Sequence, residues 1–155
     1  MEPLFKKHTI ILGILCFCAL GILSAQTASE IEVLLGTSEV TYGQAASFVL
    51  RASEAVKTSN VREAFNLAVE RKWLPKNASP DSKARLDGIS LLVMQSFGLK
   101  GGLLYSLFKN PHYSYRELAA RGAFKGKSDP HNAVSGDQLL FITNRVLSII
   151  EGERQ

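Results

Sequence analysis

The stretch YRELAARGAFKGKSDPHNAVSGDQLLFITNRVL, residues 115–147, carries the clearest structural pattern of this 155-residue chain. Its first part predicts a helix around residues 113–121 that ends at Gly122. Its last part predicts a second helix, whose free amides are capped by the Ser135 hydroxyl. Residues 126–132 lie between the two, and their glycine, proline and polar residues indicate an exposed loop. The stretch therefore predicts one helix-loop-helix unit.

The closing helix of this unit carries an apolar face. Asp137 lies in its first turn, where a carboxylate interacts favourably with the helix dipole. The face consists of residues spaced three, seven, ten and eleven positions from the first, namely Leu139, Ile142, Val146, Ile149 and Ile150. Burial of each contributes roughly 1.5 to 3 kcal/mol, so we expect this helix to be a main support of the core.

The same pattern recurs along the chain. Shifted by fifty positions, residues 62–99 align with residues 112–149 without a gap, and a half-unit near residue 40 aligns with the later part. The matched pairs include Phe65 with Tyr115, Pro80 with Pro130 and Asp87 with Asp137. Few matched positions are identical, so a chance alignment of two amphipathic helix pairs is the alternative. The shared proline and loop length favour a repeat of about two and a half units.

Three longer helices are predicted upstream. The first begins after the cap Thr41, the second covers about residues 61–72 behind a cap at residues 59–60, and the third covers about residues 86–97 and ends at Gly98. The expected buried residues are Ala45, Phe48, Val49 and Ala52 in the first helix and Val61, Phe65, Ala68 and Val69 in the second. No stretch shows the alternation of a strand. The predicted fold is all-α, with tandem helix-loop-helix units packed into one compact bundle.

An apolar cluster interrupts the predicted repeat after Gly101 and Gly102. Its members are Leu103, Leu104, Tyr105, Leu107 and Phe108. We expect a short helix that fills the core, and the alternative is a surface patch that binds a partner.

The chain begins with the composition of a secretory signal peptide. Lys6 and Lys7 precede an uncharged apolar run at residues 10–25. This run is shorter than the roughly twenty residues that span a bilayer, so cleavage after Ala25 or Ala28 is preferred to a retained anchor.

The domain organisation follows from this start. Residues 1–25 form the predicted signal peptide, residues 26–39 a tether with one apolar turn, and residues 40–152 the helical domain. A lipoprotein is a further alternative because Cys16 and Cys18 are present, but bulky residues precede both.

Charge and cysteine content narrow the functional classes. The net charge of the chain is +4, and about +3 without the signal peptide, which attracts anionic polymers only weakly. The sequence also lacks the dense basic clusters of a nucleic-acid-binding protein, so we expect no nucleic-acid partner. Both cysteines lie in the signal peptide, so the mature chain forms neither a disulfide nor a thiolate site. We expect an exported protein of the periplasm or cell envelope.

The unit as a whole resembles the S-layer homology module. The shared features are a helix ending in Gly plus an apolar residue, a proline-bearing loop, and a second helix capped by Ser or Thr with an Arg ten residues on. The resemblance covers about residues 40–149 and is strongest at residues 115–147. It implies helical hairpins that pack about a pseudo-threefold axis and bind cell-wall glycans, often pyruvylated polymers. Arg51 and Arg145 match the family's later Arg, whose alternative role is to hydrogen-bond a loop.

The chain departs from this family where the second helix of each unit begins. Family members have Thr-Arg-Ala-Glu there, and the Arg is important for gripping an acidic sugar. This chain has TYGQ, RLDG and SGDQ, so Tyr42, Leu86 and Gly136 occupy the position of that Arg. None of these side chains pairs with a carboxylate, so the resemblance implies the architecture but not the polymer specificity.

Aromatic and basic residues near the predicted loops are the candidate binding residues. Trp73, Tyr115 and Tyr42 are candidates for stacking on sugar rings. The basic candidates are Arg71, Lys72, Lys76, Arg121, Lys125 and Lys127. The alternatives are a Trp73 side chain that packs beneath its loop and an ordinary solvated basic surface.

No residue pattern indicates catalysis. His112 and His131 lie in predicted loops without the spacing of a metal pair. Aspartates recur in the repeat at Asp81, Asp87, Asp129 and Asp137, which leaves a paired-carboxylate hydrolase as an alternative. Helix capping explains Asp87 and Asp137 without chemistry, so we expect no enzyme, no cofactor and no metal.

The predicted function is non-catalytic binding of a cell-wall polymer. The alternative is an envelope protein-interaction or assembly module that keeps the fold without glycan binding. We expect no membrane contact beyond the signal segment. An oligomer is compatible with the incomplete first unit.

Overall fold

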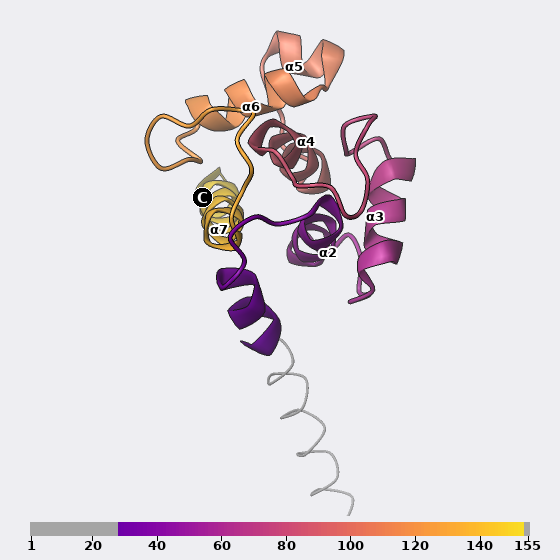
Figure 1. Ribbon diagram of the computed structural model, residues 1–155. Helices are drawn as coiled ribbons and strands as arrows, with labels where there is room; N and C mark the ends of the chain where they lie inside the picture. Colours follow the sequence, from indigo (N-terminus) through magenta and orange to yellow (C-terminus); the bar gives the residue numbers. More distant parts are fainter. Residues whose placement is uncertain (1–27, 154–155) are drawn as a thin grey trace, which may run out of the picture. The chain divides into compact units, whose positions relative to one another are not determined.

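A computed structural model describes residues 28–153 (Figure 1). The predicted signal peptide lies outside the described residues. The chain divides into two compact units between Gly36 and Thr37. In the first unit, residues 28–35 form a helix that ends at Gly36, and this helix is longer than the single apolar turn expected there.

The second unit is built from helices and the loops between them (Figure 1). The helices are α2 (Tyr42–Ala52), α3 (Val61–Glu70), α4 (Leu86–Ser96), α5 (Leu103–Phe108), α6 (Pro111–Ala120) and α7 (Gly136–Glu153). In residues 28–153 no strand is present, only isolated bridges at Thr41 with Lys83 and at Arg85 with Ala133. The all-α prediction is confirmed. No helix in this part of the chain has the length and apolar character that a membrane crossing requires.

The predicted starts of α2, α3 and α7 are correct because their caps make the expected hydrogen bonds, whereas α6 begins at Pro111, before its predicted start near residue 113. Thr41 forms a capping box with Gln44, in which each side chain accepts from the other residue's amide. Asn60 accepts from the amides of Arg62 and Glu63 at the start of α3, and Ser135 accepts from the Gln138 amide in α7. Each cap pairs amides that would otherwise lack a partner in the helix.

Several helices are followed by a residue in the left-handed conformation, some of them predicted from the sequence and some not. Gly98 and Gly122 follow α4 and α6 with φ of 63° and 67°, as expected for glycine at this position. Glu54 and Lys72 take the same conformation after α2 and α3, with φ of 58° at each. Sequence reasoning missed these two because side chains other than glycine rarely adopt it.

Three buried backbone positions, Val40, Ala84 and Val134, form what we call the central junction. The Val40 amide donates to the Val134 carbonyl (2.8 Å), the Val134 amide to the Ala84 carbonyl (3.0 Å), and the Ala84 amide to the Val40 carbonyl (2.8 Å). All three residues are fully buried. They lie two positions before α2, α4 and α7, so the cycle joins the starts of these helices.

Further hydrogen bonds extend from the central junction in two matching places. The Gly43 amide donates to the Pro80 carbonyl and the Asp87 amide to the Pro130 carbonyl, each at 2.9 Å. Each predicted proline loop is therefore held against the first turn of a neighbouring helix. This agreement is compatible with a repeated unit, which itself remains an interpretation of the sequence.

The core centres on α4, which packs against α2 and α6. Its residues Leu86, Ile89, Leu92, Val93 and Met94 are fully buried or nearly so. The predicted face of α7 is buried at Leu139, Ile142 and Val146, whereas Ile149 and Ile150 are only half-buried.

The prediction that two valines of α3 are buried is wrong. Val61 and Val69 are 42% and 48% exposed, and the buried residues of α3 are Ala64, Phe65 and Ala68. The helix packs chiefly against α2, so one narrow stripe is covered and both valines lie at its margin. In α2, Ala45 and Val49 are buried as predicted, while Phe48 and Ala52 are half-buried.

The short helix α5 exists as predicted, but it does not fill the core. Leu103, Leu104, Leu107 and Phe108 are 76%, 48%, 66% and 58% exposed, and only Tyr105 is buried. The Tyr105 ring lies over Gly101, where a Cβ would overlap it. Its hydroxyl accepts a hydrogen bond from Gln95 in α4 (2.9 Å). The buried Tyr105 side chain therefore attaches the helix, the three leucines remain exposed, and Phe108 stacks on Tyr113 of α6 with its ring more than half exposed.

Substitution of Gly88 tests the packing of α2 on α4. A Cβ at Gly88 would overlap the buried Tyr42 hydroxyl, whereas a Cβ at Gly152 in α7 would meet open space. We expect Gly88→Ala to lower the free energy of unfolding by about 1 to 3 kcal/mol. The matched Gly152→Ala should leave it unchanged or raise it by up to about 1 kcal/mol. Urea unfolding of both variants measures this, and equal values would contradict the packing described.

The attachment of α5 predicts a dependence of stability on pH. Burial raises the pKa of Tyr105 to about 12, against a smaller opposing effect of its hydrogen bond with Gln95. The unfolded chain releases this proton near pH 10, so the folded protein holds it between about pH 10 and 12 and loses stability as the pH rises through that window. Tyr105→Phe should remove this component and cost about 1 kcal/mol at pH 7 through loss of the hydrogen bond. Unfolding free energies measured from pH 9 to 12 test this, with Tyr113→Phe as control; the same pH slope in wild type and Tyr105→Phe would refute it.

Candidate functional site

The end of α3 brings together an aromatic ring and a cation, and we call residues 71–76 the α3 corner. Arg71 caps the helix, and its guanidinium carbon lies 4.8 Å from the centre of the Trp73 ring. The left-handed Lys72 turns the chain between them. Trp73 is half-buried, while Arg71, Lys72 and Lys76 are exposed. Trp73 therefore packs partly beneath its loop and also takes part in a basic surface.

In the middle of α6, Tyr115 makes contacts within the protein. Its ring stacks on Phe124 at 5.3 Å between centres and 14° between planes. Its hydroxyl donates to the Ser128 carbonyl. One face and the polar tip of Tyr115 are therefore occupied, which makes it a support of the loop rather than an open platform.

Lys125 remains at the surface beside this loop. Its ammonium lies 4.6 Å from the centre of the Phe141 ring and 3.9 Å from the Asp137 carboxylate. The Lys125 and Asp137 side chains are 67% and 68% exposed, so water screens this pair. Lys125 therefore keeps a positive charge that a ligand can reach.

Two of the predicted arginines hold the fold. Arg121 donates to the Lys100 carbonyl and forms a 2.9 Å ion pair with Glu153. Arg145 donates from Nε to the Gly122 carbonyl at 3.3 Å, which is the loop-bonding role considered for it as the alternative.

Arg51 and Tyr42 occupy different surroundings. Arg51 lines a shallow hollow of about 540 Å³ with Glu54, Val56 and Lys57. Tyr42 is buried, its hydroxyl accepts from the Arg85 amide (3.3 Å), and burial raises the pKa of its phenol. Its proposed stacking on a sugar ring is therefore wrong, because the ring faces α4 rather than solvent.

Sequence reasoning missed a charged cluster beside the central junction. An Arg85 nitrogen lies 2.7 Å from the Asp87 carboxylate and donates to Nδ1 of His131. The same His131 nitrogen lies 3.6 Å from the Asp87 carboxylate, so the three side chains form one cluster. A 2.8 Å bond from the His131 amide to the Asp129 carboxylate fixes the loop.

One signal for this cluster was present in the sequence. Thr41 and Ser135 cap α2 and α7, whereas Arg85 holds the cap position of α4 and makes no cap hydrogen bond. Because an arginine side chain has no acceptor for the free amides of a helix start, its presence at this position indicates another interaction. Its partner His131 lies 46 residues away in the sequence. Helical periodicity relates only residues a few positions apart, so it gives no information about this contact.

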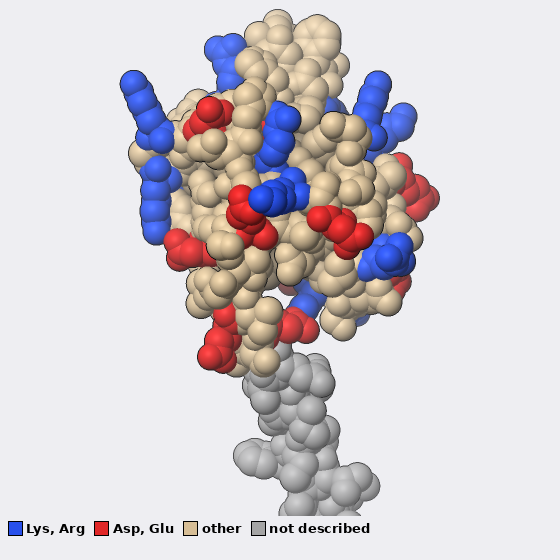
Figure 2. Space-filling model, viewed as in Figure 1, with Lys and Arg blue, Asp and Glu red and all other residues tan. Residues whose placement is uncertain are grey.

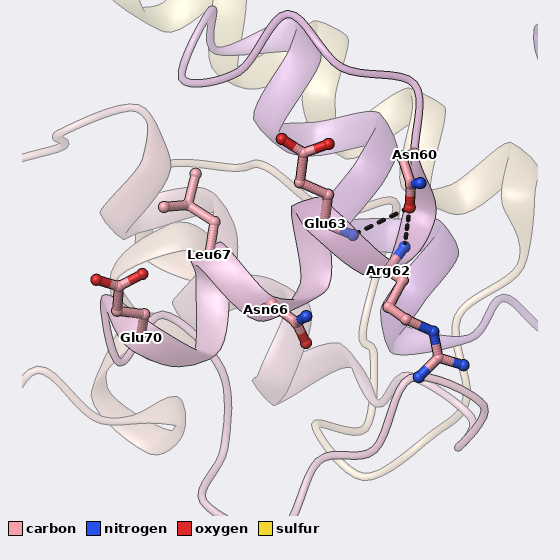
Figure 3. Close-up of a pocket in the computed structure, with 6 residues that line it drawn as sticks. All are labelled: Asn60, Arg62, Glu63, Asn66, Leu67 and Glu70. Atoms are coloured by element: carbon pink, nitrogen blue, oxygen red, sulfur yellow. Dashed lines mark hydrogen bonds between the residues drawn. The ribbon is translucent and has the colours of Figure 1, made fainter.

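Figure 2 shows acidic and basic side chains interspersed on the face drawn. Another shallow hollow, of about 480 Å³, lies on α3 and its cap (Figure 3). Its lining residues are Asn60, Arg62, Glu63, Asn66, Leu67 and Glu70. Asn60 is already used as the helix cap, and all six residues come from one helix and its cap, so the hollow is an open face rather than an enclosed site.

The predicted binding residues do not form one site. Arg71 and Trp73 contact each other at the α3 corner, and Tyr115 and Lys125 flank the loop after α6. Within residues 28–153, no group of His, Cys, Asp and Glu is arranged to hold a metal ion.

Paired substitutions of Asp87 and Asp137 test the charged cluster. Both residues lie in the first turn of a helix, but their side chains are 13% and 68% exposed. Asp87→Asn should cost about 1.5 to 3 kcal/mol, because it weakens a charge-assisted bond in a poorly solvated place. Asp137→Asn should cost less than about 1 kcal/mol, because its pair is exposed. Thermal unfolding at pH 7 measures the loss of stability in both variants. Equal losses would show that the helix dipole alone accounts for the contribution of Asp87 to stability.

Comparison with known proteins adds no assignment, because no protein-family model, curated protein or solved structure matches this chain.

Proposed function

We propose that this chain is an exported protein of the periplasm or cell envelope that binds an anionic cell-wall polymer without catalysis. The proposal rests on the α3 corner, where the Trp73 ring and the Arg71 guanidinium stand 4.8 Å apart. Sugars present apolar ring faces that pack on aromatic side chains, and acidic sugars add a carboxylate that a guanidinium binds in a fork geometry. The exposed Lys72 and Lys76 add positive charge at the same corner.

The resemblance to the S-layer homology module supports the same class of ligand, but the binding residues differ. Arg121 and Arg145 are engaged with Glu153 and Gly122, so we assign them to the fold. Lys125 remains available as a second point of contact. We therefore propose that the ligand is held mainly at the α3 corner and mainly by charge, with affinity that falls as salt rises.

Sedimentation with isolated peptidoglycan sacculi that retain their anionic polymers tests this function. Arg71→Gln and Trp73→Ala should each weaken binding by about 1 kcal/mol, which is roughly five-fold. Arg62→Gln is the matched control, because Arg62 is an exposed arginine at the other end of the same helix. It should leave binding nearly unchanged, and both arginine variants should retain the melting temperature of the wild type within a few degrees. Trp73→Ala removes a half-buried ring and should lower the melting temperature, so its binding is measured well below that temperature.

Two outcomes would remove the proposal. One is the absence of sedimentation at low salt, where attraction between charges is strongest. The other is equal weakening by Arg62→Gln and Arg71→Gln, which would mean that net charge alone binds the sacculi.

A further inference from the structure

The exposed face of α5 gathers four large apolar residues of the described part of the chain. Leu103, Leu104, Leu107 and Phe108 fall at positions one, two, five and six of the helix, and all are 48% or more exposed. That spacing places them on one side. The other large exposed apolar residues in the described part of the chain are isolated valines of α3 and residues of the preceding unit. A continuous apolar face of this kind indicates a surface that contacts something.

The surroundings of α5 hold this face outward. Tyr105 attaches the helix to α4 through Gln95, and the Gly102 amide donates to the Glu117 carboxylate of α6 at 2.9 Å. Phe108 stacks on Tyr113 of α6, with ring centres 5.6 Å apart. The helix is therefore fixed on α4 and α6 rather than loosely attached, and its leucines have no core position to occupy.

The charged residues that flank α5 in the sequence are basic. From residue 88 to residue 116 the sequence contains no Asp or Glu, and it contains Lys100, Lys109 and Arg116. Lys100 and Lys109 lie on either side of α5 and are exposed. One carboxylate, Glu117 of α6, lies beside the start of α5 and accepts from the Gly102 amide. Figure 2 shows uncharged side chains at the upper end of the molecule, where Figure 1 places α5, with a basic side chain beside them.

We propose that the apolar face of α5 inserts into the interfacial region of an anionic lipid bilayer. The three leucines and Phe108 would enter the boundary between head groups and acyl chains. Lys100 and Lys109 would bind lipid phosphates on either side while their aliphatic stems lie along the apolar region. This departs from the expectation from sequence that only the signal segment meets a membrane.

A second copy of the chain fits the same face less well. A two-fold symmetric contact through α5 would bring the same patch of both subunits together. It would place Lys100 and Lys109 of one copy near the same lysines of the other, without an acidic residue between positions 88 and 116 to compensate. Such like-charge contacts oppose association. An anionic lipid surface attracts the two lysines by its opposite charge, and its acyl chains offer an apolar environment to the exposed side chains of α5.

Flotation with lipid vesicles tests the proposal. The chain from Gln26 is used, because the apolar run at residues 10–25 would bind lipid by itself. Residues 37–155 form a compact unit with a buried core of their own, and circular dichroism checks that each variant keeps its helix content. Vesicles of phosphatidylglycerol and phosphatidylcholine in equal parts are compared with phosphatidylcholine alone.

We expect binding to the anionic vesicles and at least about ten-fold weaker partitioning for the variant Leu103→Gln/Leu107→Gln. The control Val61→Gln/Val69→Gln removes two exposed apolar residues elsewhere and should bind as the wild type does. Lys100→Gln/Lys109→Gln should reduce the preference for anionic lipid by about five-fold or more. Since Trp73 is the single tryptophan, the variant Trp73→Phe/Phe108→Trp should show a blue shift of emission with anionic vesicles.

Three results would overturn the proposal: no binding of the wild type to anionic vesicles, equal loss in the valine control, or an unchanged emission spectrum at position 108. Self-association that Leu103→Gln/Leu107→Gln abolishes, without vesicle binding, would assign the face to a second copy instead. The inference is independent of glycan binding. Leu103→Gln/Leu107→Gln should still sediment with sacculi, and Arg71→Gln should still float with vesicles, so failure of one proposal leaves the other measurable.

Discussion

Three backbone hydrogen bonds between Val40, Ala84 and Val134 form a closed cycle, and the arrangement of the helices depends on it. Each residue donates its amide to one neighbour and offers its carbonyl to the other. An unpaired amide or carbonyl in so buried a place would cost about 1 to 3 kcal/mol, so the three segments must meet together. The segments are separated by 44 and 50 residues, so this is a long-range constraint that local helix formation cannot supply.

The cycle also determines which parts of the chain reach the surface. Because α2, α4 and α7 all start near the central junction, their first turns are packed together and α4 becomes the core helix. The ends of α3 and α6 and the short helix α5 then lie outside that core (Figure 1). Residues in the first turns of α2 and α4 therefore serve packing, whereas residues at the end of α3 meet solvent. Tyr42, buried in the first turn of α2, and Arg71, exposed at the end of α3, show the contrast.

Local rules predicted the local features of this fold well. Thr41, Asn60 and Ser135 cap helices as their chemistry requires, and Gly98 and Gly122 end them in the left-handed conformation. Long-range features were less accessible. The apolar composition of α5 indicates burial, but only the position of Tyr105 against α4 decides that the leucines face outward. The contact of Arg85 with His131 joins residues far apart in the chain, and no periodicity encodes it.

The position of Arg85 bears on how a ligand is bound. The resemblance inferred from the sequence alone implies an arginine one residue into the second helix that grips a sugar acid. Arg85 stands one residue before that position, and its guanidinium is engaged by Asp87 and His131. A ligand carboxylate at the central junction would have to compete with Asp87, a partner held 2.7 Å from the guanidinium on the same helix start. The Arg71 guanidinium contacts the Trp73 ring and not a carboxylate of the protein, so it can still bind a carboxylate of a ligand. For this reason our proposal places the ligand at the α3 corner, away from the junction, and leaves α5 as a separate apolar surface with its own basic flanks.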